Sequence, residues 1–259
     1  MKRIASILLT LLLLLSGCAK AEREVRVAVI DTGISTKAIS AEHLAEGANY
    51  LLPENGTEDT FGHGTAVASV ILSHSKNAVL VPLVSNVYSK GKVSFVDNDT
   101  YAQMIRDAVD VYHCDIINIS AGLVLDKKAV REAIAYAEEK GVLVVASAGN
   151  DYVENPGQVY YPAAYETVLA VGALDKTGKE PAAFTQRGAW VNCFAPGEDI
   201  AVRTISGGKS TERGSSYATA RVTAAAVSCL QENAMSPAKL RQHLLENPTV
   251  FGGLANEVS

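Results

Sequence analysis

The stretch that decides the fold is residues 25–33, which read VRVAVIDTG. Its nearly continuous apolar run stops at Asp31, and Thr32-Gly33 follow directly. A run that is apolar on both faces is typical of a strand buried inside a parallel sheet. Asp31 is therefore expected at the carboxyl end of a buried strand, which is the edge where open parallel sheets place their chemistry.

Beyond this strand, apolar runs alternate with helical patterns. In residues 127–139, alanines and Ile134 recur at helical spacing, and Gly141 then ends the pattern. Strands separated by helices of this length predict an α/β fold of three layers, a central parallel β-sheet covered by helices on both faces. The expected strands are 25–30, 79–84, 115–120, 142–147 and 167–172; the expected helices are 62–72, 100–112, 127–139, 217–230 and one capped by Ser236-Pro237 that ends at Leu245; residues 174–212 are expected to form a hairpin region.

Two further short stretches supply groups that could work with Asp31. His63 lies between Gly62 and Gly64 before a predicted helix, and Ser216 opens another. A serine hydroxyl becomes a useful nucleophile when an imidazole takes its proton and a buried carboxylate holds that imidazole. The start of the helix at Ser216 also favours developing negative charge. Alone, each stretch is typical of a turn, a loop or a linker; together they predict attack of a serine on an acyl carbon.

These stretches, in the order acid, imidazole and serine, resemble the motifs of the subtilisin-like serine proteases, or subtilases. The resemblance implies a serine endopeptidase in which Asp31, His63 and Ser216 form the catalytic triad. It also implies that Asn150, together with backbone amide groups, stabilises the oxyanion, although Asn150 could instead simply form a turn after Gly149. The likeness covers nearly all of residues 25–247 and includes INISAG (117–122), VVASAGN (144–150), YPAA (161–164), VLAVG (168–172) and FAPG (194–197).

The resemblance further implies a pocket for the residue before the scissile bond. Its walls would be Ser120-Ala121-Gly122 and Ala148-Gly149-Asn150. Tyr160 would lie near its base, a place often held by a small residue in the family. A phenol there would shorten the pocket and predicts a preference for small residues. The alternative is that Tyr160 points outward and the pocket stays deep.

The amino-terminal residues resemble an export signal. Lys2-Arg3 precede an apolar run, residues 7–15, that is too short to span a bilayer. The following Leu15-Ser-Gly-Cys18 resembles the lipobox of bacterial lipoproteins, which implies an acylated Cys18 and an exported, membrane-anchored protein of the cell envelope. An ordinary signal with an incidental cysteine is the alternative. The expected segments are 1–17 (signal peptide), 18–24 (lipidated cysteine and tether), 25–247 (peptidase domain) and 248–259 (tail).

Charge and cysteine content limit the other functions. The formal net charge is -5 and no basic patch is evident, so nucleic-acid binding is not expected. Apart from Cys18, the cysteines are Cys114, Cys193 and Cys229, an odd number without metal-ligand spacing. We expect buried free thiols, no metal and no cofactor, with a weak calcium site elsewhere left open. The expected state is a monomer whose partners are a peptide or protein substrate and the membrane.

Several positions depart from the family pattern. Ala66 stands where the family usually has a second His, and Ala220-Arg221 stand where Pro and His are usual. No propeptide is evident between Cys18 and Asp31. We expect altered packing with activity retained at a lower level. The alternative function is a catalytically weak or inactive subtilisin-fold protein that binds a peptide or protein partner, and a narrower one is a maturation protease for a single secreted peptide.

Overall fold

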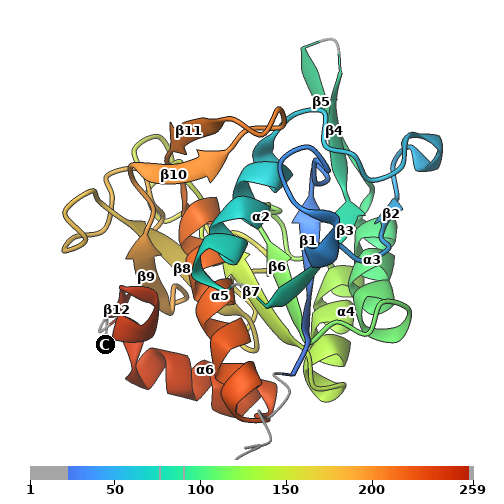
Figure 1. Ribbon diagram of the computed structural model, residues 1–259. Helices are drawn as coiled ribbons and strands as arrows, with labels where there is room; N and C mark the ends of the chain where they lie inside the picture. The colour runs from blue at the N-terminus through green and yellow to red at the C-terminus, as the bar shows by residue number, and fades with distance from the viewer. Residues whose placement is uncertain (1–22, 76, 90, 257–259) are drawn as a thin grey trace, which may run out of the picture.

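The structure is a computed structural model that describes residues 23–75, 77–89 and 91–256. The predicted signal peptide and the lipidated Cys18 lie outside these residues. Within them, the chain forms an eight-stranded sheet in the order β12-β9-β8-β7-β6-β1-β3-β2, flanked by helices (Figure 1). The strands of this sheet are β1 (Val25–Asp31), β2 (Ala48–Asn49), β3 (Ala78–Val84), β6 (Ile116–Ile119), β7 (Leu143–Ser147), β8 (Leu169–Leu174), β9 (Cys193–Pro196) and β12 (Leu254–Ala255).

Strand β1 is an interior strand, the sixth of the eight in the sheet. It pairs in parallel with β3 on one side and with β6 on the other. Val27 and Val29 join the apolar core on one face of the sheet, while Ala28 and Ile30 join the core on the opposite face. Because both faces are covered, Val27, Ala28, Val29 and Ile30 are all apolar although their side chains point alternately to opposite faces, as the sequence predicts.

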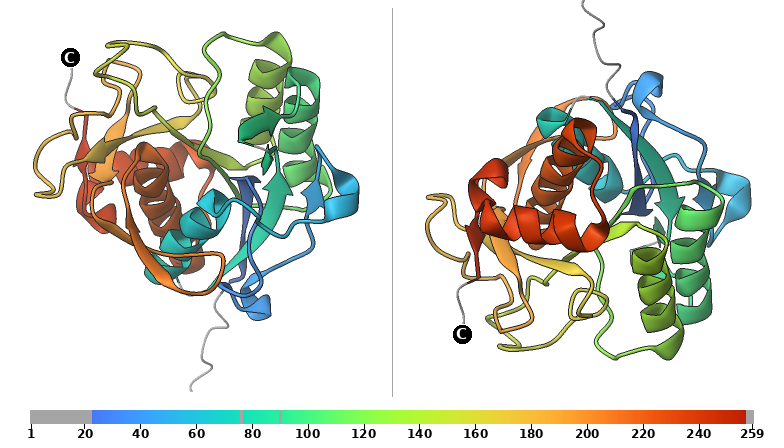
Figure 2. Two further views of the ribbon diagram at one scale, coloured as in Figure 1. Left: turned by 90° about the horizontal axis from the view of Figure 1, so that it is seen from above. Right: turned by 90° about the horizontal axis from the view of Figure 1, so that it is seen from below.

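Helices cover both faces of the sheet, as predicted. One face carries α2 (His63–His74), α5 (Ser215–Glu232) and α6 (Pro237–Glu246). The other carries α3 (Asn98–Asp110) and α4 (Lys128–Glu139). Figure 2 shows the two groups on opposite sides of the strands. In the described ranges, no helix combines the length and the apolar character needed to cross a bilayer.

The region from residue 174 to 212 differs from the predicted hairpin. Its middle part forms β9, which pairs in parallel with β8 and extends the main sheet. The hairpin is its last part, β10 (Ile200–Arg203) and β11 (Lys209–Glu212). Cys193, Phe194 and Ala195 are buried, and burial favours a place in the sheet over an exposed turn.

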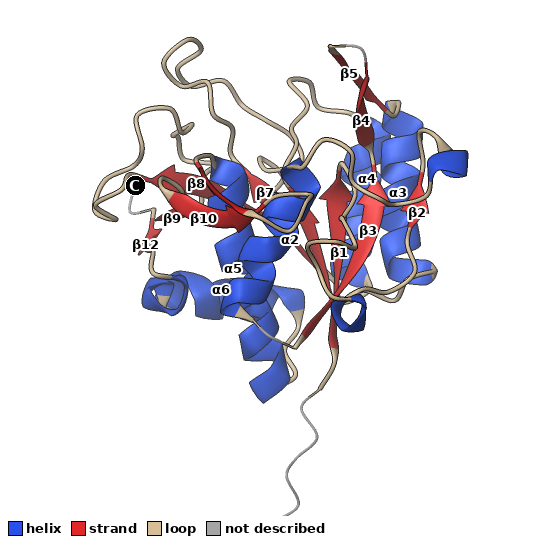
Figure 3. Cartoon of the chain, turned by 45° about the horizontal axis from the view of Figure 1, so that its top comes forward, coloured by secondary structure: helices blue, strands red, loops and turns tan. Residues whose placement is uncertain are grey.

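Several short elements were not predicted, among them the two-residue strand β2. A hairpin of β4 (Asn86–Ser89) and β5 (Lys92–Phe95) rises beyond the carboxyl ends of the parallel strands (Figure 3). Short 3-10 helices cover residues Ala41–His43, Pro53–Asn55 and Pro248–Phe251. Strand β12 follows the last of these and pairs antiparallel with β9, so residues 248–256, predicted as a tail, join the folded unit.

Candidate active site

Asp31 is the last residue of β1, at the carboxyl edge of the sheet. Its side chain is almost fully buried, with the residue 4% exposed. The amide of Thr32 donates to its Oδ1 at 2.8 Å. Its own carbonyl accepts a hydrogen bond from the amide of Ser85, which follows β3. The position predicted from the apolar run is therefore confirmed, and Asp31 is held through both its carboxylate and its main-chain carbonyl.

His63 is the first residue of α2 and faces Asp31. Its Nδ1 lies 2.8 Å from Oδ1 and 2.9 Å from Oδ2 of the carboxylate. Since a carboxylate only accepts, Nδ1 carries the hydrogen and Nε2 is left free to take a proton. The close approach depends on Gly64, because a Cβ there would lie 2.2 Å from the carbonyl oxygen of Gly33.

Asp59 fixes the start of α2 and was not predicted. This buried carboxylate accepts hydrogen bonds from the amides of Phe61, Gly62 and Thr65 at 2.8–2.9 Å, and from the Thr65 hydroxyl at 2.7 Å. Free amide groups at a helix start need acceptors, and Asp59 supplies one beside His63. An acidic residue shortly before a predicted helix is the sequence signal that could have identified it.

The surroundings of His63 favour its protonated form. Burial of the imidazole would by itself lower its pKa, but the charge of Asp31 and its hydrogen bond act in the opposite direction. Asp59 and Glu212 add smaller contributions of the same sign as Asp31. The pKa of His63 is therefore raised above its ordinary value of 6.5.

Ser216 lies in the first turn of α5, as predicted, and is 4% exposed. The ring of the next residue, Tyr217, lies 5.9 Å from the His63 ring, so the starts of α2 and α5 meet at this site. Among the described residues no hydrogen bond joins the Ser216 hydroxyl to His63. The structure therefore contains the hydrogen bond between Asp31 and His63 that the expected triad requires, and it places the start of α5 beside His63.

Asn150 follows β7 and is tied to the start of the same helix. Its Oδ1 accepts a hydrogen bond from the amide of Ser215 at 2.8 Å, which leaves its Nδ2 as the free donor. That nitrogen lies 3.5 Å from the position of a Cβ built on Gly214. The amide of Gly149 donates to the Ser215 hydroxyl at 3.3 Å, which joins the two segments a second time. The Asn150 side chain is thus held at the start of α5, beside Gly214 and Ser215.

Tyr160 lies between the two predicted pocket walls. A Cβ built on Gly122 would be 2.9 Å from Cδ1 of its ring, and one on Gly149 would be 2.7 Å from Cδ2. Glycine at both positions makes room for the ring. The phenol donates to Asp151 Oδ2 at 2.6 Å. Burial and Asp151 raise the pKa of Tyr160 to about 12, so the phenol keeps its hydrogen at neutral pH. The structure therefore does not show the alternative in which the Tyr160 side chain points outward.

The remaining wall residues line the cleft in different ways. Ser120 and Ala121 border a cavity of about 300 Å³ that also reaches Asp31, His63 and the β4–β5 hairpin. Ala148, in contrast, is fully buried behind its wall. The pocket walls therefore come from the loops after β6 and β7, two neighbouring strands of the sheet.

None of the cysteines that the structure describes lines the cavity beside Asp31 and His63. Cys114, Cys193 and Cys229 are buried free thiols, as predicted. Burial raises the pKa of the Cys114 and Cys193 thiols to about 12. Such thiols are poor nucleophiles at neutral pH. Within the part of the chain that the structure describes, no group of three or more His, Cys, Asp or Glu side chains could hold a metal ion.

Comparisons with known proteins agree with this site. The family model described as "Subtilase family" matches residues 22–257. Subtilisin Savinase of Lederbergia lenta is 32% identical over 234 residues, 88% of this chain and 84% of that protein. Alkaline elastase YaB of Bacillus sp. (strain YaB) is 33% identical over 90% of this chain, which spans 63% of that longer protein.

Solved structures show the same relationship. The protease domain of PatA superposes with a TM-score of 0.75 at 26% identity, covering 90% of this chain and 92% of that domain. The family match extends over all of the described residues, including each segment that carries a site residue. The chain therefore belongs to the subtilase family and is a subtilisin-like serine endopeptidase.

Proposed function

We propose that Ser216 is the nucleophile of this peptidase, His63 its general base and Asp31 the group that orients the imidazole. Ser216 Oγ attacks the carbonyl carbon of the scissile bond while His63 Nε2 takes its proton. His63 then gives the proton to the leaving amine, and Asp31 stabilises the imidazolium in between. The observation that carries this proposal is the pair of 2.8 and 2.9 Å contacts between His63 Nδ1 and Asp31.

The oxyanion of the tetrahedral intermediate would be held by Asn150 Nδ2 and by the backbone amide of Ser216. Support comes from the bond between Asn150 Oδ1 and the Ser215 amide, which holds the side chain at the start of α5 and leaves its NH₂ group available as a donor. A donor fixed before the reaction needs no reorganisation when negative charge develops. The dipole of α5, whose positive end lies at Ser215 and Ser216, adds to the same field.

The substrate would carry a small residue before the scissile bond. The Tyr160 ring occupies the space between Gly122 and Gly149, where a larger substrate side chain would otherwise insert. Its bond to Asp151 holds the ring in place, and Asp151 is itself held by Gln186 and Asn155. The natural substrate would be an exported peptide or protein with Ala, Gly or Ser at that position.

The site of action would be a bacterial membrane surface in the cell envelope. This part of the proposal rests on the likeness of Leu15-Ser-Gly-Cys18 to a lipobox after a basic and apolar start. Acyl chains on Cys18 would anchor the protein through burial of methylene groups. Metabolic labelling with a palmitate analogue, lost in Cys18→Ser, tests it separately from the chemistry.

Reaction with a fluorophosphonate probe tests the catalytic proposal. Folded wild-type protein is expected to be labelled on Ser216, and Ser216→Ala is expected to abolish labelling. Ser228→Ala is the matched control, because Ser228 lies on the same helix and its hydroxyl donates to the carbonyl of Ala224 within that helix. Absence of labelling in folded wild type would instead support the peptide-binding alternative.

A further inference from the structure

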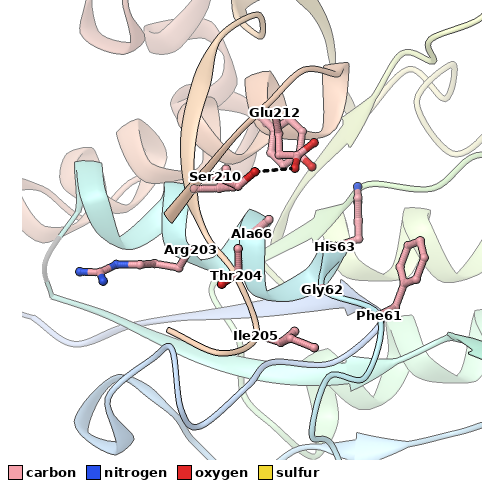
Figure 4. A pocket seen from close by; sticks show the side chains of 11 residues that line it. Phe61, Gly62, His63, Ala66, Arg203, Thr204, Ile205, Ser210 and Glu212 are labelled. Carbon is pink, nitrogen blue, oxygen red and sulfur yellow. Dashed lines mark hydrogen bonds between the residues drawn. The ribbon is translucent and has the colours of Figure 1, made fainter. Parts of the chain in front are cut away.

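A second cavity lies on the other side of His63. Phe61 and His63 border both it and the 300 Å³ cavity that reaches Ser120 and Ala121. The second cavity has a volume of about 350 Å³ and lies against the β10–β11 hairpin (Figure 4). Its remaining lining includes Thr204, Ile205, Ser210, Glu212 and Tyr217.

The position of this cavity suits the part of the substrate that follows the scissile bond and leaves with the new amine. The first cavity adjoins the Ser120–Gly122 wall, where the part that precedes the scissile bond would bind. A substrate chain that crosses Ser216 must continue beyond His63, which passes its proton to the leaving amine. The residues after the scissile bond would therefore reach the second cavity.

The cavity carries a carboxylate without a cationic partner. Glu212, the last residue of β11, is exposed and accepts a hydrogen bond from the Ser210 hydroxyl at 3.1 Å. No ion pair involving Glu212 occurs among the described residues. Arg203 also lines the cavity, but its Nη1 donates to the carbonyl of Gly207 and its guanidinium points away from His63 (Figure 4). The neighbouring Arg213 lies over the ring of Phe184.

The other side of the cavity is apolar. Phe61, which is 49% exposed, and Ile205 present carbon atoms to it. Figure 4 shows Phe61 and Ile205 on one side and Ser210 and Glu212 on the other. A lysine or arginine side chain fits such a cavity, because its apolar stem can pack against Phe61 and Ile205 while its cation reaches Glu212.

We propose that this cavity binds a lysine or arginine side chain of the substrate on the leaving-group side, with Glu212 as its counter-ion. The proposal rests on the function proposed for the triad, because it needs a substrate that crosses Ser216. Glu212 is exposed, so solvent screens the pair and the preference for Lys over Gln is expected to be about two- to fivefold. Added salt is expected to reduce it.

Internally quenched peptides test the proposal. Each has Ala before the scissile bond and carries Lys, Gln or Glu in turn at the first or the second position after it. In wild type at low salt, kcat/KM is expected to follow the order Lys, Gln, Glu at one of these positions. Glu212→Gln is expected to bring the three values together, and Glu212→Lys to reverse the order. Ratios at one pH are compared, so any effect of Glu212 on His63 cancels.

Glu139→Gln is the matched control, because Glu139 is an exposed glutamate on α4, on the other face of the sheet. This variant removes the same charge and is expected to keep the wild-type order. The proposal is overturned if charge has no effect at either position, or if the order survives in Glu212→Gln. Failure of the triad proposal looks different, since no peptide would be cut and no probe would label Ser216.

Discussion

Replacing Tyr160 by glycine is expected to change which residue the peptidase accepts before the scissile bond. The ring now lies against Gly122 and Gly149, with contacts that would be under 3 Å to a Cβ on either residue. Removing it leaves the space between the two walls open to a substrate side chain. The pocket would then accept phenylalanine, whose ring is nearly the size of the one removed.

The magnitude follows from the apolar surface that the substrate would bury there. Full burial of a phenylalanine side chain contributes about 1.5–3 kcal/mol. At about 1.4 kcal/mol for each factor of ten, this is roughly a 10- to 150-fold gain in kcat/KM for Phe relative to Ala. Loss of the hydrogen bond to Asp151 and the added backbone freedom of glycine affect both substrates equally. These effects therefore cancel in the ratio of kcat/KM for Phe to kcat/KM for Ala.

Peptide anilides that differ only in Ala, Leu or Phe before the scissile bond provide the assay. Wild type is expected to prefer Ala, and Tyr160→Gly to prefer Phe. Tyr160→Phe is the control, because it keeps the ring but removes the hydrogen bond to Asp151, and it should keep the preference for Ala. An unchanged Phe-to-Ala ratio in Tyr160→Gly, or a wild type that already prefers Phe, would refute the assignment of Tyr160 to this pocket.

Four further outcomes are expected. Asp31→Asn should lower kcat/KM by roughly 10⁴, the loss seen when another serine-protease triad loses its carboxylate, and a steady-state loss below about tenfold would exclude the orienting role. Because the base must be neutral and the pKa of His63 is raised, kcat/KM should increase with pH around a midpoint above 6.5, and a pH–rate profile with a lower midpoint would contradict this. Asp59→Ala should reduce the free energy of unfolding by about 2–3 kcal/mol in urea denaturation, since the first turn of α2 loses its acceptor. Thr223→Val should cost about 1–3 kcal/mol in the same measurement, because the Asn118 side-chain oxygen then loses its partner inside the protein; a change under about 0.5 kcal/mol would show that water replaces it.

The central sheet could be predicted because its strands are buried on both faces. Burial leaves a direct trace in the sequence, as in the apolar run that ends at Asp31. Strand β5 has no such trace, since all four of its residues are exposed. Strand β12 has two residues, too few to form a pattern. These elements are set by contacts with distant segments, which periodicity does not report.

The residues of the site likewise fall into those that the sequence predicts and those that depend on contacts between distant segments. The positions of Asp31, His63 and Ser216 at element ends follow from short motifs with glycine or small residues around them. The part played by Asp59 depends on which amides the loop turns toward its carboxylate, and no motif states this. Likewise, Glu212 faces the cavity only because the β10–β11 hairpin folds back over α2, where the amide of Arg203 donates to the hydroxyl of Ser69, 134 residues earlier in the chain.

The direction of β1 fixes how the molecule would sit if an acylated Cys18 precedes it. The described chain enters the sheet at the edge away from Asp31, and β1 then runs roughly 20 Å before it reaches the triad (Figure 1). A lipid attached before Arg23 would consequently place the amino end of β1 toward the membrane, and the carboxyl edge with Asp31 would face the aqueous phase. Polypeptides that arrive from solution could then be cut, whereas the transmembrane part of a neighbouring protein would be out of reach.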